Sequence, residues 1–314
     1  MSALSIVMRP WFWAFVAAAL AFAGTLALME GRAGLGLLVA AMTFASFSVF
    51  VGLGQMFVIT LGPGNVDLSI PATMTLAGTL SLKYMNTVPG TELAGLAVAL
   101  GIGLGAGAAN FALIRLLRIP PIIATLSASF LYQSLAIWSN RGLRIKPPPS
   151  LAEFTTERTL GIPNVALMAI ILAVVFWVLL ERSIYGRWLS SVGQNLRAAR
   201  LSGVPVDAVR AATYIISAVM AAFCGFLLSC FSGGAALNMG TEYLLMSIAV
   251  VVIGGSSIAG GNSNVPGIWA GALFMFLIVS MLNSYGLGAG VRLIMTGVII
   301  IAIVAAASGK RRGQ

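Results

Sequence analysis

Residue types that could carry out acid, base or metal chemistry are scarce in this sequence. It contains no histidine, which excludes His-based proton transfer, Ser-His-Asp triads and His-ligated metal sites. The two cysteines, Cys224 and Cys230, fall within one apolar run, and we interpret both as packing residues. An enzyme that acts within a membrane is also disfavoured, because none of the long apolar runs of the sequence carries a pair of carboxylates. We expect no catalytic residue, no metal site and no bound cofactor, so the chain is not expected to be an enzyme.

Asp67 is the most informative single residue, because a charged group near a long apolar run is costly unless it faces water, pairs or caps backbone donors. It is followed by Ser69 and Pro71, where a helix is expected to begin, so it can cap the free N–H groups of that helix. Alternatively, the glycine-rich break around it forms a gate, since nonhelical backbone at membrane depth must lie against protein or a wet cavity. The two interpretations are compatible.

Uncharged polar residues within or beside the apolar runs offer hydrogen bonding, the chemistry that holds a small polar solute weakly enough to release it. Each could instead bridge neighbouring helices. Together with Asp67, the candidates for a pathway or gate are Gln55, Thr60, Asn65, Ser69 and Gln133, with Asn110 and Ser134 as further polar candidates.

Composition indicates that the elements positioning these residues are membrane helices. The chain is 59% hydrophobic and only 8% charged, whereas soluble domains carry about 25% charged residues. The sequence therefore predicts a single all-α transmembrane domain over residues 1–314, a polytopic bundle of about ten helices. The expected spans are 11–29, 35–57, 69–86, 93–114, 121–140, 164–181, 211–231, 243–258, 265–284 and 291–308.

The distribution of charge predicts the topology. An even number of spans places both termini on one side, and the terminal cluster Lys310, Arg311 and Arg312 marks that side as cytoplasmic. Most of the 18 basic residues then lie inside, as the positive-inside rule requires. We therefore assign the net charge of +10 to membrane topology and expect no nucleic-acid partner. The expected location is the bacterial inner membrane, with lipid around the chain.

Two connections are long enough to act as docking surfaces. The periplasmic loop 141–163 carries Pro147–Pro149, which favours extended structure. The cytoplasmic loop 182–210 carries the largest cluster of charge. Separately, the fourth span contains two interleaved G-x-x-x-G pairs, which predict close helix packing; their members are Gly101, Gly103, Gly105 and Gly107.

The cytoplasmic loop contains the signature of a short capped helix. Asn195 is a favourable N-cap, Gly203 suits a left-handed stop, and Pro205 prevents the helix from resuming. Such a helix is too short to be stable alone and must pack against something. It could rest on anionic headgroups, but small Ala198 and Ala199 with Leu201 favour an apolar face that enters a groove on a cytoplasmic protein.

Four segments resemble, in order and spacing, motifs of the ribose-type permeases of ATP-binding-cassette (ABC) importers. The segment 195–203 resembles their N-x-x-A-A-R-x-S-G motif, and 64–69 resembles G-x-D-L-S. The segments 121–126 and 253–261 are similar to P-x-I-A-T-L and G-G-[TS]-S-x-x-G-G. The resemblance covers about residues 35–308.

This resemblance implies the membrane subunit of a type II importer for a small sugar or polyol. Its implied partners are a cytoplasmic ABC ATPase, which hydrolyses the ATP, a second identical or different permease subunit and a periplasmic sugar-binding protein. The residues expected to couple to the ATPase are Asn195, Arg197, Ala198, Ala199, Arg200, Leu201 and Gly203. The alternative is a stand-alone channel or secondary transporter, although the spans carry few acids or bases for an ion relay.

Overall fold

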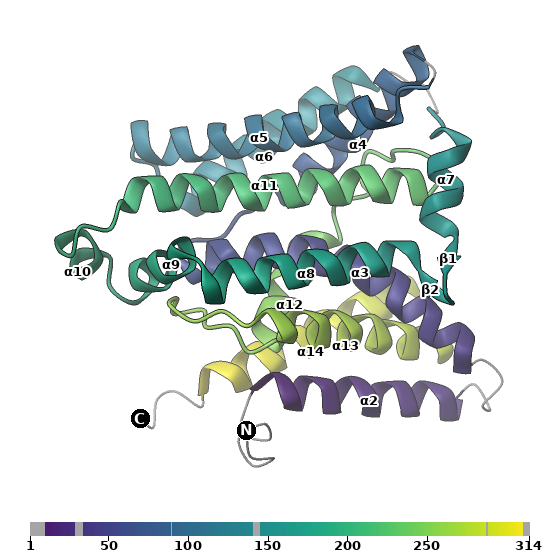
Figure 1. Cartoon of the computed structure of the whole chain (residues 1–314). Helices are drawn as coiled ribbons and strands as arrows, with labels where there is room; N and C mark the ends of the chain where they lie inside the picture. The colour runs from purple at the N-terminus through teal and green to yellow at the C-terminus, as the bar shows by residue number, and fades with distance from the viewer. Residues whose placement is uncertain (1–9, 29–33, 89, 141–144, 287, 310–314) are drawn as a thin grey trace.

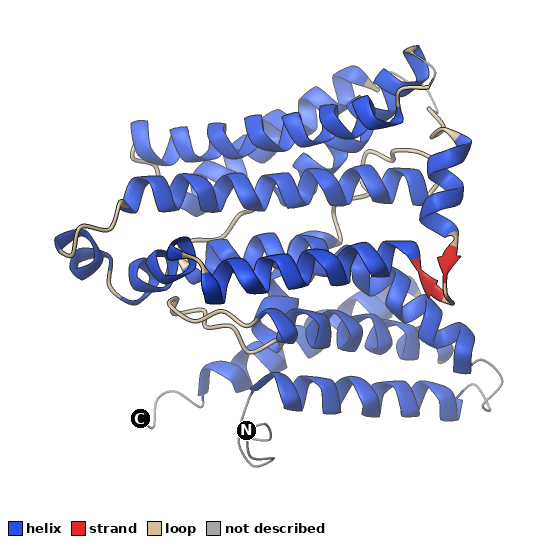
Figure 2. Cartoon of the chain, in the orientation of Figure 1, coloured by secondary structure: helices blue, strands red, loops and turns tan. Residues whose placement is uncertain are grey.

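The computed structural model describes residues 10–28, 34–88, 90–140, 145–286 and 288–309. Within these ranges the chain is a bundle of helices with one two-stranded antiparallel hairpin (Figures 1 and 2). The elements are α2 Pro10–Leu28, α3 Gly34–Thr60, α4 Ile70–Thr87, α5 Glu92–Leu116, α6 Pro121–Ser139, α7 Pro149–Thr156, β1 Arg158–Thr159, β2 Ile162–Pro163, α8 Asn164–Arg182, α9 Ile184–Gln194, α10 Leu196–Leu201, α11 Val206–Phe231, α12 Tyr243–Ile253, α13 Val265–Ser284 and α14 Ala289–Gly309.

The expectation of an all-α membrane bundle is confirmed. Seven helices of the described chain are long and apolar enough to cross a membrane, namely α2, α3, α5, α6, α8, α11 and α13. Helices α4, α12 and α14 overlap the other three expected spans. The count of about ten spans and the side of the termini stay predictions.

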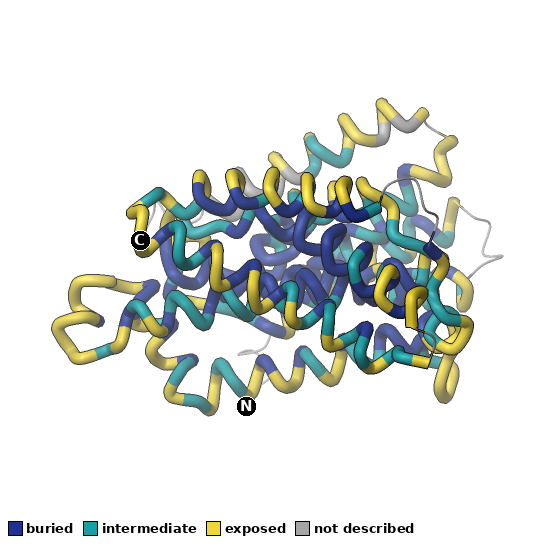
Figure 3. The backbone as a smooth tube through the Cα atoms, turned by 90° about the horizontal axis from the view of Figure 1, so that it is seen from above, coloured by how far each residue is buried: buried dark blue, intermediate teal, exposed yellow. Residues whose placement is uncertain are grey.

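Helices α3 and α11 form the centre of the bundle. Figure 3 shows buried backbone in the interior of the bundle and exposed residues around it. α11 lies beside α3, α4 and α5, while α3 also lies beside α8, α12 and α13. Large side chains fill the space between them, and the rings of Phe50 and Phe223 meet edge to face with centroids 5.3 Å apart. Cys224, also on α11, is buried and donates a hydrogen bond from Sγ to the carbonyl oxygen of Phe47 at 3.4 Å. Packing is thus the role of this cysteine.

Only one of the two glycine pairs of α5 serves helix packing. A Cβ on Gly103 would lie 2.6 Å from the Cα of Val219 on α11, and a Cβ on Gly107 would lie 2.5 Å from the Cα of Ile215. A Cβ on Gly101 or Gly105 would meet nothing within 4 Å. Close packing is therefore confirmed for Gly103 and Gly107 and wrong for the other pair.

The two long connections contain more helix than expected. In 141–163, residues 141–144 lie outside the described residues, and the proline run ends at Pro149, the first residue of α7, a position where proline is favoured. In 182–210 lie α9, α10 and the start of α11. Figure 1 shows α9 and α10 at the same end of the bundle as the start of α2 and the end of α14, with α7 and the hairpin at the opposite end.

Candidate functional site

Segment 61–69, between α3 and α4, is the nonhelical break that the sequence predicts. Gly62 and Gly64 have φ angles of 107° and 79°, which lie in the region that only glycine adopts readily. The chain then enters α4 at Ile70, with Pro71 in the first turn. The second half of the break is surrounded by protein, since Asp67 and Ser69 are fully buried, whereas Pro63 and Gly64 in the first half are exposed.

The Asp67 carboxylate is bound by three donors. Its Oδ1 accepts hydrogen bonds from the backbone N–H and the hydroxyl of Ser69 at 2.9 and 2.6 Å. Its Oδ2 accepts a hydrogen bond from the hydroxyl of Ser217 on α11 at 2.8 Å. Burial raises the pKa of Asp67 above its usual value, and these hydrogen bonds oppose that rise. Asp67 caps one backbone N–H, but Ser69 itself is the N-cap residue of α4.

The hydrogen bonds continue from Asp67 into α5 and α6. The Ser69 hydroxyl accepts from Asn110 Nδ2 at 2.8 Å, and Asn110 Oδ1 accepts from the Tyr132 hydroxyl at 3.0 Å. On the other side of the break, Tyr214 of α11 donates to Asn65 Oδ1 at 3.1 Å. Break 61–69 is therefore tied by side chains to three helices that are distant in sequence.

Gln55 and Thr125 hold the backbone of the break. Gln55 Oε1 accepts from the N–H of Asp67 at 3.2 Å, and Thr125 Oγ1 accepts from the N–H of Leu68 at 3.1 Å. Gln55 is fully buried, and none of the described residues accepts a hydrogen bond from its Nε2. This amide is a spare donor in an otherwise paired network.

The structure brings together four of the six residues predicted for a pathway or gate, namely Gln55, Asn65, Asp67 and Ser69. Thr60 lies at the start of the break, but its hydroxyl bonds to its own helix at the Met56 carbonyl. Gln133 lies elsewhere and donates to the carbonyl oxygen of Leu237 at 2.7 Å. Of the further candidates, Asn110 joins the network, while Ser134 is exposed and bonds within α6.

Four members of the network were not among the predicted residues: Thr125, Tyr132, Ser217 and Tyr214. Thr125 could have been found, because it is the threonine of the segment that resembles P-x-I-A-T-L. Ser217 and Tyr214 lie inside the apolar run of α11, and nothing local distinguishes them from packing residues.

Helix α10 confirms the prediction of a short capped helix after Asn195. The Asn195 side chain accepts a hydrogen bond from the N–H of Ala198 at 3.0 Å, and Gly203 has a φ angle of 80° after the last turn. Ala198 and Leu201 are exposed, the latter to 83%. Ala199 is 4% exposed, so it packs inward and does not belong to the outward apolar face that the sequence predicts. Arg197 and Arg200 are exposed.

Helix α9 carries α10 and ends against two nonhelical segments. Three backbones meet here without side chains between them, and we call the meeting point the glycine junction: Gly62 from the break, Gly193 from α9, and Gly260 and Gly261 from segment 254–264. The N–H of Gly261 donates to the Thr60 carbonyl oxygen at 2.9 Å, and the Ser190 hydroxyl donates to the Gly261 carbonyl oxygen at 2.6 Å.

The glycine junction has no room for a methyl group. A Cβ on Gly193 would overlap the Thr60 carbonyl oxygen and the nitrogen of Gly261, and a Cβ on Gly260 would overlap the Cα of Gly62. The obstructing atoms are backbone atoms, so no rotamer change relieves the overlap. Only Asn195 separates α10 from α9. Helix α10 is thus connected to break 61–69 through α9, whose backbone touches the other two segments at the glycine junction.

The side chains of this arrangement offer hydrogen bonds. Among the described residues no group of three His, Cys, Asp or Glu side chains could hold a metal ion. One buried carboxylate is surrounded by neutral hydroxyl, amide and backbone donors, an arrangement that fixes geometry and supplies no acid and base pair. The candidate site is therefore a buried polar break that contacts, at the glycine junction, the helix preceding the exposed α10.

The sequence of the chain is similar to those of known permease proteins. The family model described as branched-chain amino acid transport system / permease component matches residues 37–304. Over 269 residues the chain is 30% identical to the probable ABC transporter permease protein y4mJ of Sinorhizobium fredii, covering 84% of this chain and 80% of that protein. Over 266 residues it is 30% identical to the ribose import permease protein RbsC of Bacillus subtilis, covering 81% and 79%.

A third relative is the galactofuranose transporter permease protein YtfT of Escherichia coli, 33% identical over 220 residues that cover 69% of this chain and 64% of that protein. No solved structure matches the chain.

Proposed function

This chain belongs to the branched-chain amino acid transport system / permease component family, and on that premise we propose that it translocates a small sugar or related polyol across the inner membrane as one subunit of an ABC importer. The relatives are permease proteins of ABC, ribose and galactofuranose transporters. The chain is a multi-pass membrane protein. ATP hydrolysis belongs to a separate cytoplasmic subunit, and this chain holds no cofactor of its own.

The proposed topology has about ten spans with both termini and α10 in the cytoplasm. Supporting this, α9 and α10 lie at the same end of the bundle as the start of α2 and the end of α14 (Figure 1). The α9 to α11 region at this end is rich in arginine, as the positive-inside rule requires of a cytoplasmic loop. The opposite end, with α7 and the hairpin, then faces a periplasmic sugar-binding protein.

The observation that carries the proposal is the connection from α10 through α9 to the glycine junction. A six-residue helix with an exposed leucine is poorly stable alone, so its outward face is suited to a groove on the ATPase. When the ATPase moves α10, α9 presses on Thr60 and Gly261 without a flexible side chain between them. The displacement reaches break 61–69 and the Asp67 network, which alternates the pathway between its two sides.

Polar residues of the break supply the hydrogen-bonding groups that a sugar requires. Gln55, with its spare amide donor, and Asn65 are the members we assign to the pathway or gate, while Asp67 and Ser69 hold the break in shape. Thr60 acts through its carbonyl oxygen at the junction. A second permease subunit, identical or related, completes the translocation route.

Reconstitution with the partner ATPase and the binding protein tests the proposal. ATP-dependent uptake of labelled pentoses and hexoses into proteoliposomes is measured for the wild type and for Ala198→Glu. A carboxylate on the outward face of α10 would be buried unpaired in the proposed groove, which costs several kcal/mol, so uptake should be lost. Ala198→Ser is the matched control and should retain uptake, because the hydroxyl is small and uncharged.

Wild-type uptake by Ala198→Glu would contradict the role of α10. Uptake by liposomes without ATP, driven by an ion gradient, would instead favour a channel or secondary transporter.

A further inference from the structure

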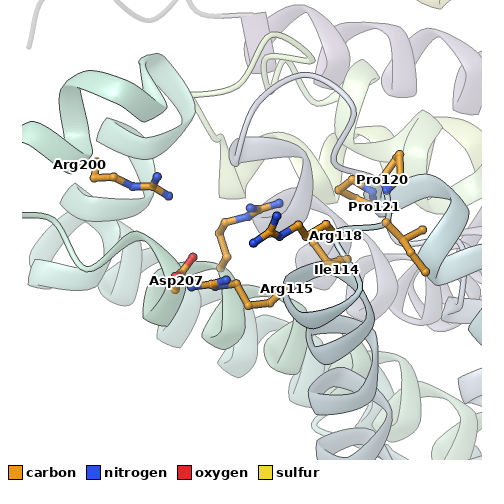
Figure 4. A pocket seen from close by; sticks show the side chains of 9 residues that line it. Ile114, Arg115, Arg118, Pro120, Pro121, Arg200 and Asp207 are labelled. Atoms are coloured by element: carbon orange, nitrogen blue, oxygen red, sulfur yellow. Dashed lines mark hydrogen bonds and ion pairs between the residues drawn. The ribbon is translucent and has the colours of Figure 1, made fainter.

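A basic pocket lies where α5 ends, beside α10 and α11. It has a volume of about 490 Å³ and is lined by four arginines, Arg115, Arg118, Arg200 and Arg210, with Asp207 and apolar residues completing the wall. Figure 4 shows Arg115 and Arg118 near Asp207, with Arg200 approaching from α10 on the other side of the gap. The pocket therefore lies between the exposed helix α10 and the main bundle.

The positive charge of the pocket is not balanced by the protein. Asp207 is the only acidic side chain in its lining, and it pairs with Arg115, whose Nε lies 2.8 Å from Asp207 Oδ2. Within the described residues no ion pair occupies Arg118, Arg200 or Arg210. Three guanidinium groups that converge on one cavity are the pattern that binds a phosphate through several charge-assisted hydrogen bonds.

The backbone at Arg118 holds this residue in an unusual conformation. Its φ angle is 57°, a left-handed conformation that a residue with a long side chain rarely adopts. This conformation allows the turn 117–120 between α5 and α6 to direct Arg118 toward Arg115 (Figure 4). Unfavoured backbone conformations concentrate where they place a functional side chain.

Apolar side chains around the pocket indicate the source of the phosphate. Leu116 and Leu117 at the end of α5 are 76% and 64% exposed, and Ile122 and Ile123 at the start of α6 are also exposed. A free anion would not cover this apolar surface, whereas the acyl chains of a phospholipid would. Basic pockets between membrane helices at the cytoplasmic face bind anionic headgroups in this way.

We propose that this pocket binds the phosphate headgroup of an anionic phospholipid, whose acyl chains lie on the exposed leucines and isoleucines of α5 and α6. The bound lipid bridges Arg200 of α10 to Arg118 and Arg210, so it holds α10 against the bundle. The inference rests on the proposed topology, which places this end of the bundle in the cytoplasm, and not on the solute that the chain transports.

Native mass spectrometry of the full-length purified chain tests the inference. The wild type, equilibrated with phosphatidylglycerol or with zwitterionic phosphatidylcholine of the same chain length, should retain the anionic lipid selectively. Arg118→Gln/Arg200→Gln should weaken that retention by about a hundredfold, the equivalent of one charge-assisted hydrogen bond lost at each of the two arginines. The matched control is Arg187→Gln on α9, an exposed arginine that does not line the pocket, and it should retain lipid as the wild type does.

Equal retention of the two lipids by the wild type, or unchanged retention by the double variant, would overturn the proposal. A third arm adds inorganic phosphate in place of lipid. If phosphate binds the wild type and phosphatidylglycerol does not displace it, the ligand is a free anion and the lipid assignment is wrong. Arg118→Lys keeps the charge and should keep most of the retention, which separates loss of the site from loss of folding.

Discussion

Replacement of Gly193 by alanine is the sharpest test of the connection between α10 and the break. The added methyl would overlap the Thr60 carbonyl oxygen and the Gly261 nitrogen, so α9 must move away from both segments. Overpacking of this kind costs about 1–3 kcal/mol. Loss of the hydrogen bond from the Ser190 hydroxyl on α9 to the Gly261 carbonyl oxygen, 2.6 Å long, adds about 1 kcal/mol. The expected loss of unfolding free energy is thus about 2–4 kcal/mol.

Two measurements on Gly193→Ala separate mechanical coupling from stability. Thermal unfolding in detergent should report the lower stability, and ATP-dependent uptake in proteoliposomes with the partner ATPase should report the coupling. Because the contact that transmits the motion is displaced, uptake should fall by roughly tenfold or more. A tenfold fall corresponds to about 1.4 kcal/mol. ATP hydrolysis by the complex should continue, since the ATPase itself is unchanged.

Gly101→Ala is the matched control, because a Cβ there would meet nothing within 4 Å. Alanine in a helix is favoured over glycine by about 0.5–1 kcal/mol, so this variant should be as stable as the wild type or slightly more so, with normal uptake. The reasoning is refuted if Gly193→Ala unfolds and transports like the wild type. It is also refuted if uptake and ATP hydrolysis fall together while the folded protein is intact.

Three further outcomes are expected. Asp67→Ala leaves two buried serine hydroxyls without their acceptor and should lower the unfolding free energy by about 2–4 kcal/mol; Asp67→Asn keeps one acceptor oxygen and should lose less, as thermal unfolding would show. Asn195→Ala removes the cap of α10, worth about 1 kcal/mol, and should reduce uptake, whereas Asn195→Ser should retain it because serine also caps. Gly103→Ala should destabilise the chain through its contact with α11 and Gly105→Ala should not; equal melting temperatures for the two would contradict the assigned packing.

Local signals in the sequence were sufficient for the all-α membrane bundle and for α10. Apolar runs of bilayer length need only composition to be recognised, and α10 is defined by a cap at Asn195 and a stop at Gly203 within one short segment. The inward orientation of Ala199 was missed because a helix of six residues has too few turns to show which face is apolar. The early end of α12 at Ile253 was missed because hydropathy continues past the glycines that stop the helix.

The Asp67 network could be predicted only in part, because its partners are distant in sequence. Ser217 follows Asp67 by 150 positions, and which face of α11 turns inward is not visible in a helix that is apolar all round. The glycine junction was missed for a related reason. Its contacts are made by backbone atoms, so the residue types in the sequence do not indicate them. Thr60, for example, contributes a carbonyl oxygen that every residue type possesses.

The shortness of α12 has a consequence for how the chain is inserted during its synthesis. Its 11 residues rise about 16 Å, roughly half of the ~30 Å hydrocarbon core, so α12 alone is too short to cross the membrane as a helix. Asn264 at the start of α13 donates from Nδ2 to the carbonyl oxygen of Gly254 at 3.0 Å, which closes the two helices into a hairpin. We therefore expect α12 to enter the membrane together with α13 and to pack against α3, which precedes both in the chain.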